Sequence, residues 1–148
     1  MDEYFLGIDA GSTVCKAAVF DAQGRQISVA SRRTPLDRPR PGWVEADPER
    51  AVEALFAVIA EAAERSGRPE AIAGIGISGA MVGLWLIDGD GKAIRPGINW
   101  EDSRAQDLLD AMIAERPNLM SDIFAVSGSV LQQGCTLPVT AALVREEP

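Results

Sequence analysis

The chain has 148 residues, carries a net charge of −8 and contains no histidine. An acidic chain of this kind repels nucleic acid and anionic membranes, so we expect neither as a partner. Without histidine, Ser-His-Asp and Cys-His catalysis and most zinc sites are excluded, and any catalysis must rest on carboxylates, a metal ion, lysine or arginine.

The two cysteines, Cys15 and Cys135, form no C-x-x-C pair, and we interpret them as reduced thiols of a cytosolic protein. The sequence shows no signal peptide and no apolar run long enough to cross a bilayer. These features predict a soluble, cytoplasmic protein of about one domain.

The first thirty residues predict three short strands, over 4–8, 14–20 and 26–30. Tight turns separate the strands, the second being Asp21-Ala22-Gln23-Gly24, so we expect an antiparallel meander. Residues 31–46 form a loop rich in proline and arginine, which we interpret mainly as a solvated face.

A helix is predicted over 48–66. Asp47 is its expected N-cap, Pro48 suits the first helical position, and Gly67 is the expected C-cap. Helical spacing predicts one buried face, made of Val52, Leu55, Phe56, Ile59 and Ala63.

The apolar run at 71–78 predicts a central strand, and residues 84–87 predict another strand. The turn Asp88-Gly89-Asp90-Gly91 follows. It repeats the residue spacing of the turn at 21–24, so we expect two similar hairpins.

A second helix is predicted over 103–115, ended by Pro117. The segment 118–144 is expected to be helical in pieces, interrupted by Gly128 and Gly134. The order of the predicted elements indicates an α/β domain in which helices pack on a mixed sheet.

Residues 74–79 read Gly-Ile-Gly-Ile-Ser-Gly, which matches the glycine pattern of dinucleotide-binding folds. That fingerprint requires a helix directly after the strand, whereas a further strand is predicted here. We therefore interpret these glycines as points where the backbone approaches a ligand or a neighbouring strand closely. No G-x-x-x-x-G-K-[ST] motif is present, which excludes a P-loop enzyme.

The turn between the first two strands, Asp9-Ala10-Gly11-Ser12-Thr13, carries the most informative chemistry. Gly11 lets the backbone approach phosphates, Ser12 and Thr13 can donate to their oxygens, and Asp9 can hold Mg²⁺ directly or through water. Lys16 adds positive charge. The spacing fits a hairpin turn without any ligand equally well.

A second cluster, Trp100-Glu101-Asp102-Ser103-Arg104, stands at the entry to the second helix. Asp102 and Arg104 can accept from and donate to a polyhydroxylated ligand, and Trp100 offers a flat apolar face to a sugar. The alternative is that Asp102 or Ser103 caps the helix while Trp100 belongs to the core, and the segment alone favours this alternative.

Together these segments resemble the FGGY family of carbohydrate kinases, within the superfamily of actin-like ATPases and sugar kinases. The matching segments run along essentially the whole chain in the family's order: residues 5–13 with Lys16, 20–21, 41–45, 76–79 and 100–104. The Pro-Gly-Trp-Val-Glu segment at 41–45 and the Trp-x-Asp-x-Arg segment at 100–104 are the most family-specific.

The resemblance implies that residues 1–148 are an incomplete ribonuclease-H-like domain, one of two domains that flank an ATP cleft. It also implies Mg²⁺-dependent transfer of the γ-phosphoryl group of ATP to a hydroxyl of a sugar or polyol. ATP phosphates are expected at Asp9, Gly11, Ser12, Thr13 and Lys16, with Mg²⁺ on Asp9. The acceptor is expected at a site lined by Gly79, Ala80, Met81, Val82, Trp100, Asp102 and Arg104.

The family's catalytic aspartate and second domain would lie beyond Pro148, so no catalytic residue is assigned, and the chain by itself is expected to lack turnover. Xylulose-type kinases usually have Gln-Met-His where this chain has Ala80-Met81-Val82, which favours a polyol or deoxy-sugar over xylulose. Two alternatives stay open: an activator ATPase of the same superfamily with an iron–sulfur cluster, and a non-catalytic module that binds nucleotide or sugar. Homo-oligomerisation is also left open.

Overall fold

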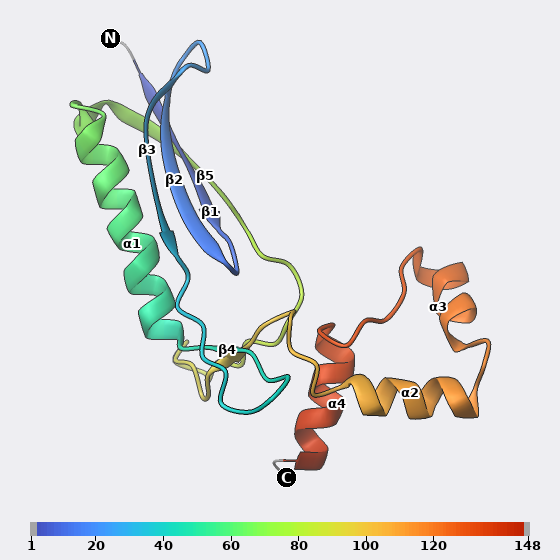
Figure 1. Cartoon of the computed structure of the whole chain (residues 1–148). Coiled ribbons are helices and arrows are strands. Elements are labelled where there is room, and N and C mark those ends of the chain that lie inside the picture. The colour runs from blue at the N-terminus through green and yellow to red at the C-terminus, as the bar shows by residue number, and fades with distance from the viewer. Residues whose placement is uncertain (1–2, 147–148) are drawn as a thin grey trace. The chain divides into compact units, whose positions relative to one another are not determined.

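The computed structural model describes residues 3–146, which form two compact units (Figure 1). The first unit contains residues 3–36 and 47–80, and the second contains residues 37–46 and 81–146. The chain thus contributes a short segment to the second unit before it completes the first. Each unit has a hydrophobic core of its own.

A four-stranded mixed sheet with the order β3-β2-β1-β5 forms the first unit. β1 (Tyr4–Ala10) pairs antiparallel with β2 (Val14–Asp21), and β2 pairs antiparallel with β3 (Gln26–Arg33), which confirms the predicted meander. β5 (Ile72–Gly79) pairs parallel with β1. A parallel neighbour requires a crossover connection, and the helix that follows β3 supplies it.

That helix, α1 (Pro48–Arg65), packs on one face of the sheet. The Asp47 carboxylate caps its start by accepting from the backbone N–H groups two and three residues later, at 2.9 and 3.1 Å. Gly67 follows its end in the left-handed region, with a φ of 74°. The predicted N-cap is therefore confirmed, whereas the C-cap is Ser66, one residue before the predicted Gly67. The short 3-10 helix η1 (Pro69–Ala71) then leads on into β5.

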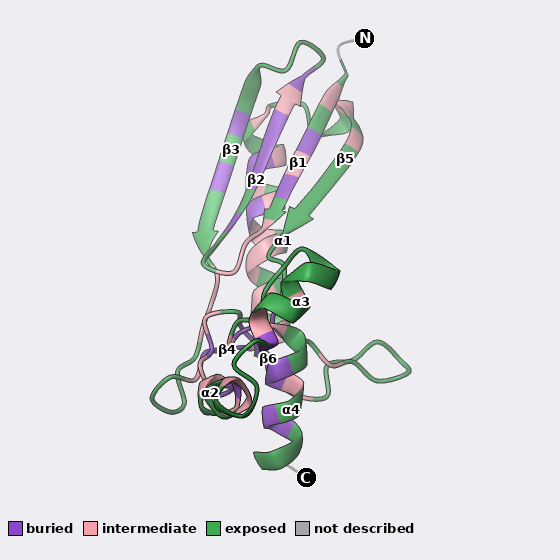
Figure 2. Ribbon diagram, turned by 90° about the vertical axis from the view of Figure 1, so that its right-hand side faces the viewer, coloured by how far each residue is buried: buried purple, intermediate pink, exposed green. Residues whose placement is uncertain are grey.

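The core of the first unit lies between α1 and the sheet. Alternate residues of β1 and β2 face the helix, and Figure 2 shows the resulting buried positions on the strands. The buried members are Leu6, Ile8, Cys15, Ala17, Val19, Ala30, Val58 and Ala62. The Ser28 hydroxyl donates to the Ala62 carbonyl at 2.6 Å, which ties β3 to the last turns of α1.

The buried face predicted for α1 is partly wrong. The face against the sheet is centred on Val58 and Ala62, whereas Val52 and Phe56 are 50% and 65% exposed. Apolar residues occupy more of the helix surface than the sheet can cover, so the helical period alone does not decide which of them are buried.

The prediction of a central strand at 71–78 is also wrong for the described residues, because β5 lies at an edge of the sheet. Its Ile75 and Ile77 pair with Leu6 and Ile8, and so they lie on the same face as α1. They are nevertheless 63% and 74% exposed, since α1 packs over β2 and β3.

The second unit is mainly helical, with α2 (Gln106–Glu115), α3 (Leu119–Ser127) and α4 (Thr136–Glu146). Two short strands, β4 (Glu45–Ala46) and β6 (Gly97–Ile98), pair antiparallel. The core of this unit contains Leu84, Ile98, Ala105, Val139, Ala142 and Leu143.

The helical pieces predicted for 118–144 are confirmed. α3 ends at Gly128, which has a φ of 69°, and α4 begins shortly after Gly134. α2 starts at Gln106, later than the predicted Ser103, because the residues between them form a turn.

The strand predicted at 84–87 is wrong. Leu84 and Ile87 form only isolated bridges, to Ile98 and Ala93. Alternating apolar residues here have no long partner strand to extend the pairing, so the local pattern does not grow into a ladder.

The predicted likeness of the two hairpin turns is confirmed bond for bond. Oδ1 of Asp21 accepts from the N–H groups two and four residues later, both at 2.9 Å, and Oδ1 of Asp88 does the same at 2.9 and 2.8 Å. Gly24 and Gly91 occupy the same left-handed position, with φ of 77° and 79°. The same local sequence therefore builds the same turn in both units.

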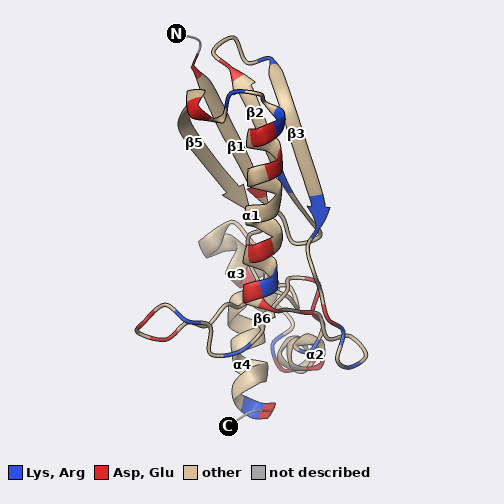
Figure 3. Ribbon diagram, turned by 90° about the vertical axis from the view of Figure 1, so that its left-hand side faces the viewer, with Lys and Arg blue, Asp and Glu red and all other residues tan. Residues whose placement is uncertain are grey.

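Acidic residues are the main charges on α1, as the red bands in Figure 3 show. They are Glu49, Glu53, Glu61 and Glu64. None of the helices within residues 3–146 is both long and apolar enough to cross a membrane.

Candidate functional site

The turn between β1 and β2 is tight and braced from β3. A side chain at position 11 would overlap the Val14 carbonyl, so this position needs glycine. The Thr34 hydroxyl donates to the Gly11 carbonyl at 2.7 Å, and the Thr34 N–H donates to the Thr13 carbonyl at 3.0 Å. These bonds hold the backbone of the turn, while Ser12 is half-buried and the Thr13 side chain is exposed.

Charged and polar side chains gather on the sheet face opposite α1, beside this turn. Asp9 is paired with Lys16 on one side and with Ser78 on the other, so all three share that face. They line a shallow hollow of about 420 Å³, together with Gly7, Phe20 and Gly76. Asp9 and Lys16 are both exposed, so a carboxylate and an ammonium group stand available to a ligand.

Two of the three glycines of β5, Gly74 and Gly79, pack closely against β1, as the sequence predicted, whereas a Cβ at Gly76 would meet nothing within 4 Å. A Cβ at Gly74 would lie 3.2 Å from the Phe5 ring, and one at Gly79 would lie 3.1 Å from the Ala10 carbonyl. No helix follows the strand directly, since α2 begins only at Gln106, so the segment is not a dinucleotide fingerprint. Ala80 closes the first unit, with its N–H donating to the Ala10 carbonyl at 3.1 Å.

In the second unit, Met81 and Val82 are exposed, and hydrogen bonds hold the backbone of the residue that follows them. Met81 is 82% exposed, and Val82, which is 54% exposed, has a φ of 60° that is rare for a β-branched residue. The next residue, Gly83, donates its N–H to the Gly134 carbonyl at 3.0 Å and accepts from the Thr136 hydroxyl at 2.7 Å.

The backbone of Trp100 packs against both Gly83 and Gly134. A Cβ at Gly83 would lie 3.5 Å from the Trp100 nitrogen, and a Cβ at Gly134 would overlap the Trp100 carbonyl. The indole itself is 46% exposed, and it lines a hollow of about 390 Å³ bordered by α2, α3 and residues 131–134. The structure therefore places the Trp100 backbone against Gly83 and Gly134, and the assignment of Val82 and Trp100 to one acceptor site stays a prediction.

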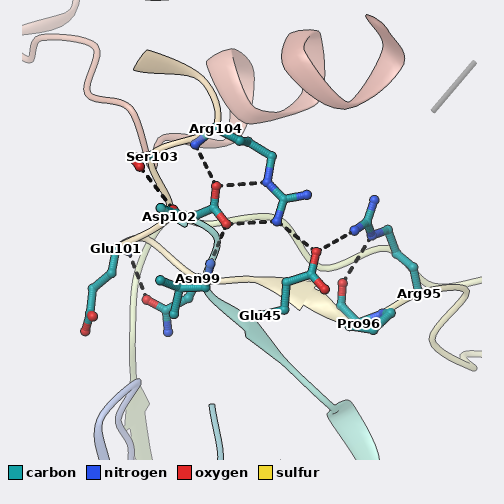
Figure 4. Close-up of polar contacts among 10 residues, drawn as sticks. Glu45, Arg95, Pro96, Asn99, Glu101, Asp102, Ser103 and Arg104 are labelled. Carbon is teal, nitrogen blue, oxygen red and sulfur yellow. Dashed lines mark hydrogen bonds and ion pairs between the residues drawn. The ribbon is translucent and has the colours of Figure 1, made fainter. Parts of the chain in front are cut away.

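Asp102 and Arg104 are fully buried against a segment far away in the sequence (Figure 4). The Asp102 carboxylate accepts from Nε and Nη2 of Arg104, both at 2.8 Å, from the Arg104 N–H at 2.9 Å and from the Val44 N–H at 2.7 Å. Arg104 Nη2 also donates to Oε1 of Glu45 at 2.8 Å. That oxygen accepts from Arg95 Nη2 at 2.8 Å as well.

The charges of this pair are stabilised by each other. Burial raises the pKa of Asp102, but hydrogen bonds from the Arg104 side chain and from the Val44 and Arg104 N–H groups outweigh it, so the pKa lies below its ordinary value. Burial likewise lowers the pKa of Arg104, and its bonds to Asp102 and Glu45 raise it by more. A depressed carboxyl pKa stabilises the fold above the ordinary value for aspartate, and this contribution is lost as the pH falls through the lower folded value.

Direct contact between Asp102 and a ligand would require an accessible carboxylate. In this structure the side chain is 0% exposed, and both oxygens are occupied by protein donors. Nor does Asp102 act as the N-cap of α2. The N-cap position is Ala105, and no side chain there accepts from the first N–H groups of the helix. Its observed role is to hold Arg104 and the Val44 backbone.

The sequence did not assign Trp43, Glu45 and Arg95 to this site. The Arg104 guanidinium lies 3.8 Å from the centre of the Trp43 ring, and Glu45 joins Arg104 to Arg95. The one available indication was that the segment at 41–45 carries an acidic residue, Glu45, and the segment at 100–104 carries a basic one, Arg104. Spacing along the chain could not pair them, because 59 residues separate Glu45 from Arg104.

The two cysteines lie in different units. Cys15 is buried in the sheet core and Cys135 is half-buried just before α4. Within the described part of the chain, no group of three or more His, Cys, Asp or Glu side chains is arranged to hold a metal ion.

Comparison with known proteins gives a consistent picture. A sequence model of the FGGY family of carbohydrate kinases, N-terminal domain, matches residues 4–148. The glycerol kinase of Citrifermentans bemidjiense is 35% identical over 130 residues, which are 81% of this chain and 26% of that protein. A probable L-xylulose kinase of Haemophilus influenzae is 30% identical over 146 residues, 98% of this chain and 30% of that protein.

Among solved structures, the xylulose kinase of Rhodospirillum rubrum superimposes with a TM-score of 0.86 and 29% identity, over 99% of this chain and 30% of that one. The chain therefore spans about 30% of the length of these relatives or less. The α/β fold with a mixed sheet and packed helices, predicted from the sequence, is confirmed by this superposition.

Proposed function

The chain belongs to the FGGY family of carbohydrate kinases, and on this premise we propose that it forms part of the N-terminal domain of an enzyme that transfers the γ-phosphoryl group of ATP to a hydroxyl of a sugar or polyol. The observation that carries the proposal is the exposed pair Asp9 and Lys16 on neighbouring strands. The turn that joins these strands contains Gly11, at a position with no room for a side chain. Phosphoryl transfer depends chiefly on positioning and charge neutralisation, and this surface offers groups for both.

The ATP phosphates are proposed to bind at Asp9, Gly11, Ser12, Thr13 and Lys16. Gly11 keeps the turn free of a side chain, so backbone and hydroxyl donors can approach phosphate oxygens, and Lys16 adds a positive charge. Of these residues, Asp9 and Lys16 line the hollow near Ser78, and Gly11, Ser12 and Thr13 form the turn that joins their two strands.

Asp9 is the proposed Mg²⁺ ligand. Mg²⁺ is commonly held by one or two carboxylates together with substrate phosphates and water, so a single exposed carboxylate beside a phosphate site fits it. When bound, the ion neutralises charge on the β- and γ-phosphates. The chain's own contribution is to fix Asp9 at the end of β1, where the ladders to β2 and β5 hold it on both sides.

Within the second unit, the acceptor is proposed to bind at Met81, Val82 and Trp100, with Asp102 and Arg104 supporting the Trp100 backbone. Gly79 and Ala80, which end the first unit, are proposed acceptor-binding residues by the same family resemblance. Trp100 presents an exposed flat ring, of the kind that packs against the carbon skeleton of a polyol. Ala80 and Val82 add no polar group, which favours a polyol or deoxy-sugar. We assign no base to this chain, and we expect the chain by itself to lack turnover.

The test is binding of Mg-ATP to the 148-residue chain by isothermal titration calorimetry. Asp9→Asn removes the charge that holds the metal, and we expect an affinity loss of roughly 10- to 100-fold, the range for a bond to a charged group. Asp90→Asn, at an exposed turn of the second unit, is the matched control for net charge and should leave the affinity unchanged. Equal affinities for the parent and Asp9→Asn would remove Asp9 from the proposed site.

A further inference from the structure

The two most family-specific segments of the chain bind each other. The Val44 N–H donates to Asp102 at 2.7 Å, and the Val44 carbonyl accepts from the Asn99 N–H at 2.9 Å. One turn further along, the Ser103 N–H donates to the Gly42 carbonyl at 2.8 Å. These bonds join residues 42–44 to residues 99–103 and fix both neighbours of the Trp100-Glu101 dipeptide.

The Arg104 side chain links the same two segments by ion pairs. It is 0% exposed, and its guanidinium bonds two carboxylates, Asp102 from its own segment and Glu45 from the other. Figure 4 shows the guanidinium between the two acids. The third nitrogen, Nη1, is buried and has no hydrogen-bond partner among residues 3–146.

The guanidinium plane also lies against an aromatic ring. Its central carbon is 3.8 Å from the centre of Trp43, within the range of a favourable cation–π contact. A planar, five-donor group can stack and bond two carboxylates at once, whereas the compact ammonium of lysine cannot. The position therefore requires the shape of arginine as well as its charge.

Trp100 has the opposite character. Trp100 is 46% exposed, while Asn99 directly before it and Asp102 two residues after it are buried and hydrogen-bonded. Gly134 packs directly on the Trp100 carbonyl. The ring thus projects from a backbone that is held on both sides by buried hydrogen bonds.

We propose that Arg104 is a positioning residue for Trp100: by joining Asp102, Glu45 and Trp43, it sets the aromatic wall against which the acceptor packs, without touching the acceptor. Asp102 acts through Arg104 and Val44, and so belongs to the support of the site. The inference rests on the proposed function in one respect, that Trp100 lines the acceptor site. The placing of Trp100 by Arg104 can be tested without any acceptor.

The experiment uses ¹⁹F NMR of the 148-residue chain labelled with 5-fluorotryptophan. The three tryptophans, Trp43, Trp85 and Trp100, all lie in the second unit and give three resonances, assigned with single Trp→Phe variants. In Arg104→Lys, which keeps the charge, we expect the Trp43 and Trp100 resonances to shift or broaden. Trp85 is the internal reference, because a movement of all three resonances to one position reports unfolding.

Arg95→Lys is the matched control. Arg95 bonds the same oxygen of Glu45 at 2.8 Å but is not hydrogen-bonded to Asp102. We expect Trp100 to keep its resonance in this variant. An unchanged Trp100 resonance in folded Arg104→Lys, or an equal displacement in Arg95→Lys, overturns the proposal.

Asp102→Asn keeps the test decisive if Arg104→Lys does not fold. The amide has the shape of the carboxylate but replaces one acceptor oxygen with a donor, so one bond to Arg104 or Val44 is lost. A displaced Trp100 resonance supports the proposal, and an unchanged one in the folded variant overturns it. Titration of the parent with glycerol is a separate arm: a Trp100 resonance that does not respond counts against the proposed acceptor site and leaves the Arg104→Lys comparison valid.

Discussion

At the scale of single residues, Val82 holds the least favourable backbone conformation outside glycine. Its φ of 60° is the one positive value found for a non-glycine residue within the described chain. Gly83 behind it is bonded to Gly134 and Thr136, so the chain cannot relax by moving that neighbour. Conformations of this kind cost on the order of 1–3 kcal/mol and often occur at functional sites.

Val82→Gly should therefore stabilise the second unit. Relief of the strain outweighs the roughly 0.5–1 kcal/mol that glycine's freedom in the unfolded chain costs, so we expect the free energy of unfolding to rise by about 1 kcal/mol. Urea unfolding followed by tryptophan fluorescence measures this, because all three tryptophans belong to that unit. Val130→Gly is the control, at a position of 41% exposure without a positive φ, and it should destabilise. A loss of stability in Val82→Gly as large as in the control would contradict the strain argument.

At the scale of elements, helix ends and turns follow local chemistry closely. Asp47 bonds two N–H groups at the start of α1, and Asp21 and Asp88 build the same turn in two different units. In each case the partner is within four residues of the aspartate, so the bond forms wherever the short sequence occurs.

Asp47→Ala should lower the free energy of unfolding of the first unit by about 1 kcal/mol, the usual cost of losing an N-cap. Thermal unfolding followed by far-ultraviolet circular dichroism checks the change. Glu53→Ala removes one carboxylate from an exposed position of the same helix and should change the stability by less than about 0.5 kcal/mol. If both variants lose the same stability, the effect comes from helix charge and the cap contributes little.

At the scale of the whole molecule, the first unit leaves several large apolar side chains uncovered on β5 and on α1. Ile75 and Ile77 of β5 are 63% and 74% exposed, and on α1 the exposed apolar residues are Val52 and Phe56. An unpaired edge strand with apolar side chains is a ready template for association with another polypeptide. The relatives are more than three times longer than the stretch that matches.

We therefore expect the 148-residue chain to self-associate as its concentration rises, and Ile77→Lys to reduce this by placing a charge on the uncovered edge. Sedimentation velocity over a concentration series measures the weight-average mass. Ile27→Lys is the matched control, since Ile27 is 40% exposed on β3, at the opposite edge of the sheet. Monomeric parent chain at every concentration, or equal effects of both variants, would rule out the β5 edge as the contact.

The sequence by itself determined the features that depend on near neighbours. The meander of β1 to β3, the capped start of α1, the twin turns and the break between α3 and α4 all rest on bonds within a few residues or on regular alternation. Such patterns are legible along the chain because the interacting groups are close in it.

Only the tertiary structure decided what depends on distant partners. Which stripe of α1 is buried was set by the sheet, and the edge position of β5 was set by which strands are present to pair with it. From the sequence, Asp102 was either a ligand-binding residue or a helix cap, and the structure shows a buried ion pair with Arg104 instead. Val44, which donates to Asp102, and Glu45, which accepts from Arg104, lie almost sixty residues away in the sequence, and no spacing rule predicts contacts of that range.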